Sequence, residues 1–121
     1  MPFLLYFRMA WTIETLNETV DAELAALPAD LRAKFVRISE LLEVFGPQQV
    51  HEPHVKYIGD ISFPLWEMRL SGKTGIARAL YVTQVRERIV VLHAFVKKTQ
   101  KTPTSAIAMA RRRYRQLLNQ P

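Results

Sequence analysis

Three apolar, β-prone runs follow one another closely in the second half of the chain, and the short turns between them restrict how it can fold. The runs are LWEMRL at 65–70, IARALYV at 76–82 and RIVVLHAFV at 88–96. The segments between them, SGKTG and TQVRE, are too short for a crossover and can join only antiparallel strands. We predict an antiparallel meander. Its third strand is apolar at both odd and even positions, which predicts a central strand covered on both faces.

The first half of the chain has helical spacing instead. Apolar residues recur every three or four positions in two stretches, which predicts two consecutive amphipathic helices packed on the sheet. Asn17 is a suitable cap for the first helix, Pro28 separates the two, and Gly46-Pro47 ends the second. The apolar positions are Leu16, Val20, Leu24 and Leu27, then Leu31, Phe35, Ile38, Leu42 and Phe45.

The remaining segments complete the predicted fold. The run WTIETL at 11–16 favours a short first strand, and residues 46–64, with three prolines and two histidines, predict a connecting loop. Thr102-Pro103 supplies a cap and a first-turn proline for a last helix. The order β-α-α-β-β-β-α is that of an α+β fold: a small antiparallel sheet with an N-terminal helical hairpin and a C-terminal basic helix.

A chain of 121 residues fits one domain, which we place at residues 11–119. Residues 1–10 are expected to be an N-terminal extension, and either Met1 or Met9 could be the true start. The apolar run at 2–7 is too short for a spanning helix and lacks the features of a secretory signal. We therefore expect a cytoplasmic protein with no membrane contact.

Charge is distributed unevenly along the chain. Residues 1–60 hold 5 Lys and Arg against 9 Asp and Glu, whereas residues 61–121 hold 12 against 2, within a total net charge of +6. A basic half of this kind suits a polyanion, with nucleic acid the first candidate and an anionic membrane or acidic protein behind it. A solvated basic surface with no ligand is the alternative.

Several classes of chemistry are excluded by composition. The absence of cysteine removes a thiolate nucleophile, a disulfide framework and any Cys-based metal site. The chain has no GxSxG motif, and its four glycines are too scattered for a phosphate loop. His51, His54 and His93 could in principle bind a metal, but no carboxylate pattern flanks them and Pro53 interrupts the first pair. We expect neither a metal nor another cofactor.

Cations on the predicted strands can carry a different chemistry. Arg69, Arg78 and Lys97-Lys98, with Lys101 just after, can meet on one patch when strands pair. Arginine binds phosphate in a bidentate way, and a lysine crowded by other cations has a lowered pKa. Such a patch could cleave a phosphodiester without a metal, or could only bind backbone phosphate. The two acids of this half, Glu67 and Glu87, are expected to pair with neighbouring arginines rather than form an acid/base dyad.

Three longer segments carry a family resemblance: EPHVKYI at 52–58, LWEMRLSGKTGIARALYV at 65–82 and VVLHAFVKKTQKTPTSAIAMAR at 90–111. They resemble the phage-derived Gp49-like, HigB-type branch of the RelE/ParE toxin superfamily, over about residues 11–118, and FVKKTQKTP is the most specific piece. The resemblance implies the toxin of a type II toxin-antitoxin pair that cleaves mRNA as a ribosome-dependent endoribonuclease. It also implies neutralisation by a helix-turn-helix antitoxin of the HigA kind.

The resemblance also implies roles for individual residues. Arg69 and Arg78 match basic family positions on the second and third strands, and Lys97 and Lys98 match the position after the last strand, so these four are the expected catalytic residues. The chain lacks an obvious acidic or histidine catalytic set in those positions, and Tyr114 matches no family tyrosine securely, so the proton-transfer residue stays open. The expected RNA-binding residues are His54, Lys56, His93, Lys101, Arg111, Arg112 and Arg113.

Alternatives remain for the histidine, for the terminal arginines and for the function. His93 could instead be a buried, hydrogen-bonded residue of a central strand. The cationic collar formed by Arg111, Arg112, Arg113 and Arg115 could pair with the acidic helices at residues 18–43, or dock an acidic antitoxin. A toxin of the same fold could inhibit DNA gyrase without cleaving anything, and a simple RNA-binding module is a third reading.

Overall fold

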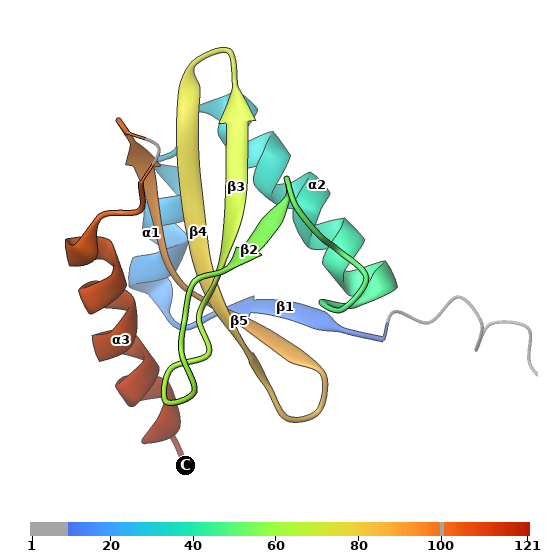
Figure 1. Cartoon of the computed structure of the whole chain (residues 1–121), viewed down its shortest axis with the longest axis vertical. Coiled ribbons are helices and arrows are strands. Elements are labelled where there is room, and N and C mark those ends of the chain that lie inside the picture. The colour runs from blue at the N-terminus through green and yellow to red at the C-terminus, as the bar shows by residue number, and fades with distance from the viewer. Residues whose placement is uncertain (1–9, 100) are drawn as a thin grey trace, which may run out of the picture.

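The computed structural model describes residues 10–99 and 101–121 and forms one mixed sheet with helices on both faces (Figure 1). The five strands lie in the order β1-β5-β4-β3-β2. Their bounds are β1 Thr12–Thr15, β2 Val55–Tyr57, β3 Trp66–Gly72, β4 Gly75–Gln84 and β5 Arg88–Lys97; the helices are α1 Glu18–Ala25, α2 Ala29–Phe45 and α3 Thr104–Leu118. The predicted extension at 1–10 lies outside the described residues except for Ala10, as do Met1 and Met9.

The predicted α+β fold is confirmed, with two refinements. A three-residue strand, β2, forms inside the segment predicted as a loop and pairs antiparallel with β3, Lys56 lying opposite Glu67. The first strand pairs parallel with β5, Thr12 opposite Arg88, so the sheet is mixed rather than purely antiparallel. The prediction that the third run, β5, is the central strand is wrong: β4 is the middle strand, and β5 lies next to it, buried along most of its length.

The helix boundaries follow the predicted local signals at Asn17 and Gly46. The side chain of Asn17 accepts a hydrogen bond from the Val20 N–H at 3.1 Å, and α2 ends at Gly46, whose φ of 83° favours glycine. The predicted cap at Thr102 is wrong. Pro103, whose side chain has no polar atom, stands at the cap position of α3, and the Thr102 hydroxyl donates to Glu67.

The two faces of the sheet carry separate cores. On one face α1 and α2 cover β-strand residues such as Met68, Leu70 and Tyr81. On the other face α3 covers Leu80 and Leu92, among others. Figure 1 shows α3 beside the lower part of this second face, while the hairpin between β3 and β4 rises above it. The upper part of that face is therefore where polar side chains can gather.

Candidate functional site

Cations from three neighbouring strands gather on the face that α3 leaves partly open. Arg69 of β3 lies opposite Arg78 of β4. Lys97 of β5 lies opposite Ile76, which is two residues before Arg78 on β4. Since side chains two residues apart share a face, all three cations point to the same side of the sheet. Arg78 and Lys97 are only 4% and 5% exposed, whereas Arg69 is partly exposed. The sheet thus brings together three of the four residues expected to be catalytic.

A buried carboxylate lies at the centre of this cluster. Glu67 is 2% exposed, and its Oε1 lies 3.2 Å from Nε of Arg69 and 3.6 Å from Nε of Arg78. Its Oε2 accepts the hydrogen bond from Thr102. The expected pairing of Glu67 with arginine is confirmed, but its central position was missed. The sequence signal for this position was that Glu67 stands two residues before Arg69 on one predicted strand, which places both side chains on the same face. Glu87, in the turn before β5, forms no ion pair with the described residues.

Burial and neighbouring charges change the electrostatics of the cluster. Burial lowers the pKa of Lys97, the positive charge of Arg78 lowers it further, and Glu67 opposes the change. Burial likewise lowers the pKa of Arg78, against the opposing effect of Glu67, although a guanidinium stays protonated in any protein environment. The Arg78 Nη1 donates to the carbonyl oxygen of Ala77 at 3.0 Å, but its buried Nε makes no hydrogen bond. The cluster therefore holds fixed positive charge beside a lysine that releases its proton more readily than usual.

A cavity of about 340 Å³ opens onto these arginines, and we call it the cationic cavity. It is lined by Lys34, Pro53, His54, Arg69, Ser71, Ile76 and Arg78. His54 therefore joins the two arginines, and Lys34 of α2 joins them without having been predicted. The His54 carbonyl accepts the Arg69 backbone N–H at 2.8 Å, which fixes the loop against β3. Such a cavity can hold a phosphate group between arginine side chains.

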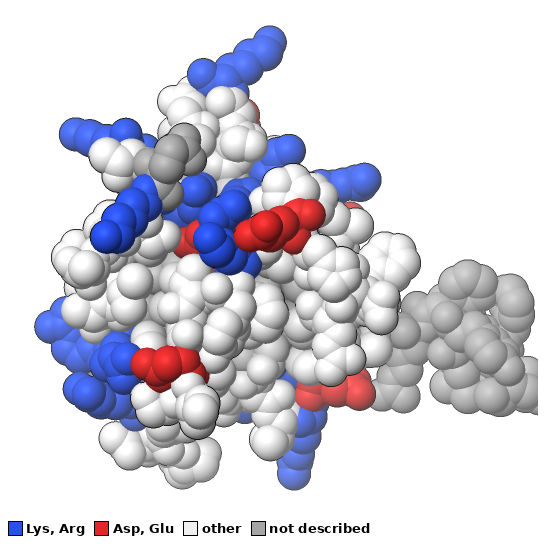
Figure 2. Space-filling model, in the orientation of Figure 1, with Lys and Arg blue, Asp and Glu red and all other residues white. Residues whose placement is uncertain are grey.

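Three other cations that were expected to contact RNA or to act in catalysis are exposed at the surface. Lys56 is exposed on β2 opposite Glu67, and Lys98 and Lys101 are exposed after the end of β5. Figure 2 shows Lys and Arg side chains gathered over the upper part of this face, around acidic side chains, with a second group at the lower left where α3 lies. The arrangement gives an extended basic surface of the kind that backbone phosphates follow.

Two expected RNA-binding residues have structural partners instead. The Nδ1 of His93 lies 2.9 Å from Oε1 of Glu23, and Nη1 of Arg113 donates to the same oxygen at 2.8 Å and to the Leu92 carbonyl at 2.9 Å. Arg113 is 8% exposed. Both residues tie β5 and α3 to α1, in line with the alternatives for His93 and for the collar. We therefore leave both out of any proposed RNA contact.

The other arginines of the collar stay closer to the surface. Arg111 lies 3.7 Å from Asp60 and its guanidinium stands 4.7 Å above the centre of the Phe63 ring, whereas Arg112 and Arg115 are exposed. The collar is thus divided, because Arg113 shares the buried face of α3 with Ala110 and Leu117.

Two other properties of the described part of the chain bear on the site. Within the described residues, 10–99 and 101–121, no three His, Asp or Glu side chains are grouped so that they could hold a metal ion. None of the helices there combines the length and apolar character needed to cross a membrane.

Comparison with known proteins gives a family and a shared fold. The family model described as "Phage derived protein Gp49-like (DUF891)" matches residues 22–115, which confirms the Gp49-like resemblance. A chain in the crystal structure of the toxin-antitoxin complex RelBE2 from Mycobacterium tuberculosis has the same fold, with a TM-score of 0.53 and 19% sequence identity, over 74% of this chain and 93% of that chain. No curated protein matches.

Proposed function

The chain belongs to the Gp49-like family of phage-derived proteins, and we propose that it is the toxin of a type II toxin-antitoxin pair that cleaves mRNA on the ribosome. The observation that carries this proposal is the buried cluster of Arg69, Arg78 and Lys97 around Glu67, open to a cavity of phosphate-binding character. The fold shared with a chain of a toxin-antitoxin complex supports the toxin assignment.

In the proposed reaction, the two arginines bind and stabilise the phosphate that reacts. The ribose 2′-oxygen attacks phosphorus, the new O2′–P bond forms, and the P–O5′ bond breaks, which leaves a 2′,3′-cyclic phosphate and a 5′-hydroxyl. Negative charge grows on the phosphate oxygens in the transition state, and Arg69 and Arg78 are held where fixed positive charge can offset it. The Nε of Arg78, which lies 3.6 Å from Glu67 but makes no hydrogen bond, is a donor that a phosphate oxygen could satisfy.

Two proton transfers complete the reaction. A base takes the proton of the 2′-hydroxyl, and an acid gives one to the departing 5′-oxygen. We assign the first transfer to Lys97, because burial and the charge of Arg78 lower its pKa and make its neutral form more accessible. His54, which lines the cationic cavity together with both arginines, is assigned the second transfer. Lys98 is assigned to backbone contact rather than chemistry, since it is exposed past the end of β5.

The proposed partners follow from the basic surface. The backbone of mRNA and ribosomal RNA in the cytoplasm is proposed to be contacted by five cations: Lys56, Lys98, Lys101, Arg111 and Arg112. A helix-turn-helix antitoxin of the HigA kind is proposed as the neutralising partner, encoded beside this chain.

Mapping of mRNA 5′ ends after brief induction tests the function. We expect new 5′ ends within coding sequences, protected when the neighbouring helix-turn-helix protein is co-expressed and absent for Arg78→Ala. The matched control is Arg88→Ala, which removes an arginine that pairs with Glu14 far from the cavity. Intact transcripts accompanied by DNA damage would instead favour gyrase inhibition, and bound but uncut RNA would favour a simple binding module.

A further inference from the structure

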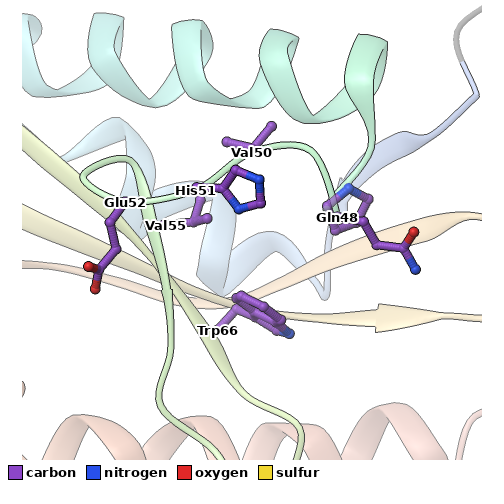
Figure 3. A pocket seen from close by; sticks show the side chains of 7 residues that line it. Gln48, Val50, His51, Glu52, Val55 and Trp66 are labelled. Atoms are coloured by element: carbon purple, nitrogen blue, oxygen red, sulfur yellow. The ribbon is translucent and has the colours of Figure 1, made fainter.

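A second cavity lies across the loop that borders the cationic cavity, and we call it the Trp66 pocket. Its volume is about 380 Å³, and it is lined by Pro47, Gln48, Val50, His51, Glu52, Val55 and Trp66. Figure 3 shows the His51 imidazole projecting from the loop and the Trp66 indole lying on the side of the sheet, with the pocket between the two rings. A flat group can therefore enter with an aromatic ring on either side.

The indole of Trp66 is held in place by two other aromatic rings. Tyr57 meets it edge-on at 5.0 Å between ring centres, and the fully buried Tyr81 lies nearly parallel to it at 6.5 Å. Trp66 itself is only partly buried. A fixed, accessible aromatic plane of this kind is the surface on which unpaired bases stack in single-stranded RNA recognition.

The rim of the pocket carries groups that suit the edge of a base. The Gln48 amide has both donors and an acceptor, and the Glu52 carboxylate offers acceptors. Both side chains are exposed, and Figure 3 shows them on opposite sides of the pocket, with their polar ends turned outward. Amide and carboxylate groups of this kind can pair with the polar edge of a nucleobase.

The pocket is adjacent to the cationic cavity through three consecutive loop residues. Glu52 lines the Trp66 pocket, and its carboxylate lies 4.0 Å from Nη1 of Arg69. Pro53 and His54 line the cationic cavity. Trp66 and Arg69 are three residues apart on β3, roughly 10 Å along the strand, and their side chains lie on opposite faces of the sheet. One RNA strand can thus reach both sites by crossing the loop at 52–54.

We propose that the Trp66 pocket binds one nucleobase of the RNA strand, next to the phosphate held by Arg69 and Arg78. This inference rests on the proposed function and adds a base-binding site to its phosphate site. Purines bind better than pyrimidines here, because two fused rings offer more area for stacking between Trp66 and His51.

The test compares two small probes on the intact protein by calorimetry: adenosine monophosphate, which has base and phosphate, and ribose 5-phosphate, which has only the phosphate. We expect the wild-type protein to bind the first at least about five-fold more tightly, the lower limit for stacking of one base. Trp66→Leu should remove the difference while ribose 5-phosphate still binds. Gln48→Ala should reduce it, and the matched control Gln49→Ala, which lines a different cavity, should not.

Each other outcome overturns the inference. Equal binding of the two probes by the wild-type protein, or no binding of either, means that the pocket holds no base. An unchanged preference in both Trp66→Leu and Gln48→Ala, together with weaker antitoxin binding, assigns the pocket to a protein partner. The proposed function fails separately: a preserved preference for adenosine monophosphate without new mRNA 5′ ends rejects cleavage and keeps the base site, whereas new 5′ ends without the preference reject only the base site.

Discussion

Two clusters on this molecule each surround one carboxylate with hydrogen-bond donors or cations, and they differ in whether a buried donor is left without a hydrogen bond. Glu23 receives hydrogen bonds on one oxygen from Arg113, from the Ala94 N–H at 3.1 Å and from His93, and Arg113 also reaches a backbone carbonyl. Around Glu67, the nearest Arg78 nitrogen stays at 3.6 Å with no hydrogen bond, and a cavity opens onto it. A saturated cluster fastens elements together, whereas a cluster with an unsatisfied buried donor beside a cavity is suited to a ligand.

The largest expected effect is on the open cluster. Arg78→Ala should lower the cleavage rate about 10³-fold, because it removes fixed charge from the transition state. Single-turnover cleavage of ribosome-bound mRNA measures this, with Arg88→Ala as the control for loss of a paired arginine. A melting curve must accompany the rate, because Arg78 is buried beside Glu67 and its removal leaves that carboxylate with one cation fewer. Full activity in a folded Arg78→Ala protein would reject the proposed site.

Lys97 should give the next largest effect and a pH signature. Its pKa is lowered from 10.5, so the rate of the wild-type protein should rise with pH as the neutral amine forms below that value. Lys97→Arg should lower the rate about 10²-fold and lose this rise, since a guanidinium keeps its proton. The measurement is a rate profile from about pH 6 to about pH 9. Lys98→Ala is the neighbouring control, and an identical profile for Lys97→Arg would remove Lys97 as the base.

The saturated cluster should affect stability instead of rate. Arg113→Met should lower the free energy of unfolding by about 1–3 kcal/mol, because Glu23 and the Leu92 carbonyl lose a charged donor. Denaturant titration measures the loss, and Arg112→Met, on the exposed side of α3, is the control. A loss of cleavage with unchanged stability would reverse the roles of the two clusters.

The same cluster predicts a pH dependence of stability. Burial works to raise the pKa of Glu23, but hydrogen bonds from Arg113, His93 and the Ala94 N–H lower it below its ordinary value of 4.5. The resulting stability is present above pH 4.5 and is lost as pH falls through the lower pKa of the folded state. Glu23→Gln should therefore show a smaller loss of stability on acidification than wild type, a result that acid titrations of both proteins would check.

The smallest expected effect concerns the exposed arginines of α3. Arg112→Ala with Arg115→Ala should flatten the salt dependence of ribosome binding by roughly one unit of log-log slope per lost contact, and should spare cleavage of bound mRNA. Binding measured across salt concentrations decides this. An unchanged slope with weaker antitoxin binding would move these arginines to the partner interface.

The sequence predicted those parts of the site that depend on strand alternation. Arg69, Arg78 and Lys97 meet because short turns force antiparallel neighbours, a constraint visible in the turn lengths. Glu67 was underestimated because its central place depends on the register between β3 and β4. The strand β2 was not predicted, because a strand of three residues in a proline-rich segment is too short to show an alternating pattern. Arg113 could have been assigned inward, since it stands three residues after Ala110 and four before Leu117 on the apolar stripe of α3.

The Thr102 hydroxyl bond to Glu67 has a consequence for inhibition. This bond connects the start of α3 to the carboxylate that faces both arginines. A ligand that displaces Thr102, just before α3, breaks the bond and removes a donor from the Glu67 carboxylate beside the arginines, without covering the cavity. The reverse also holds, because coupling between two sites is reciprocal: phosphate in the cavity would weaken that ligand by the same factor. The protein could thus be silenced from its helix, at a distance from the groups that act on RNA.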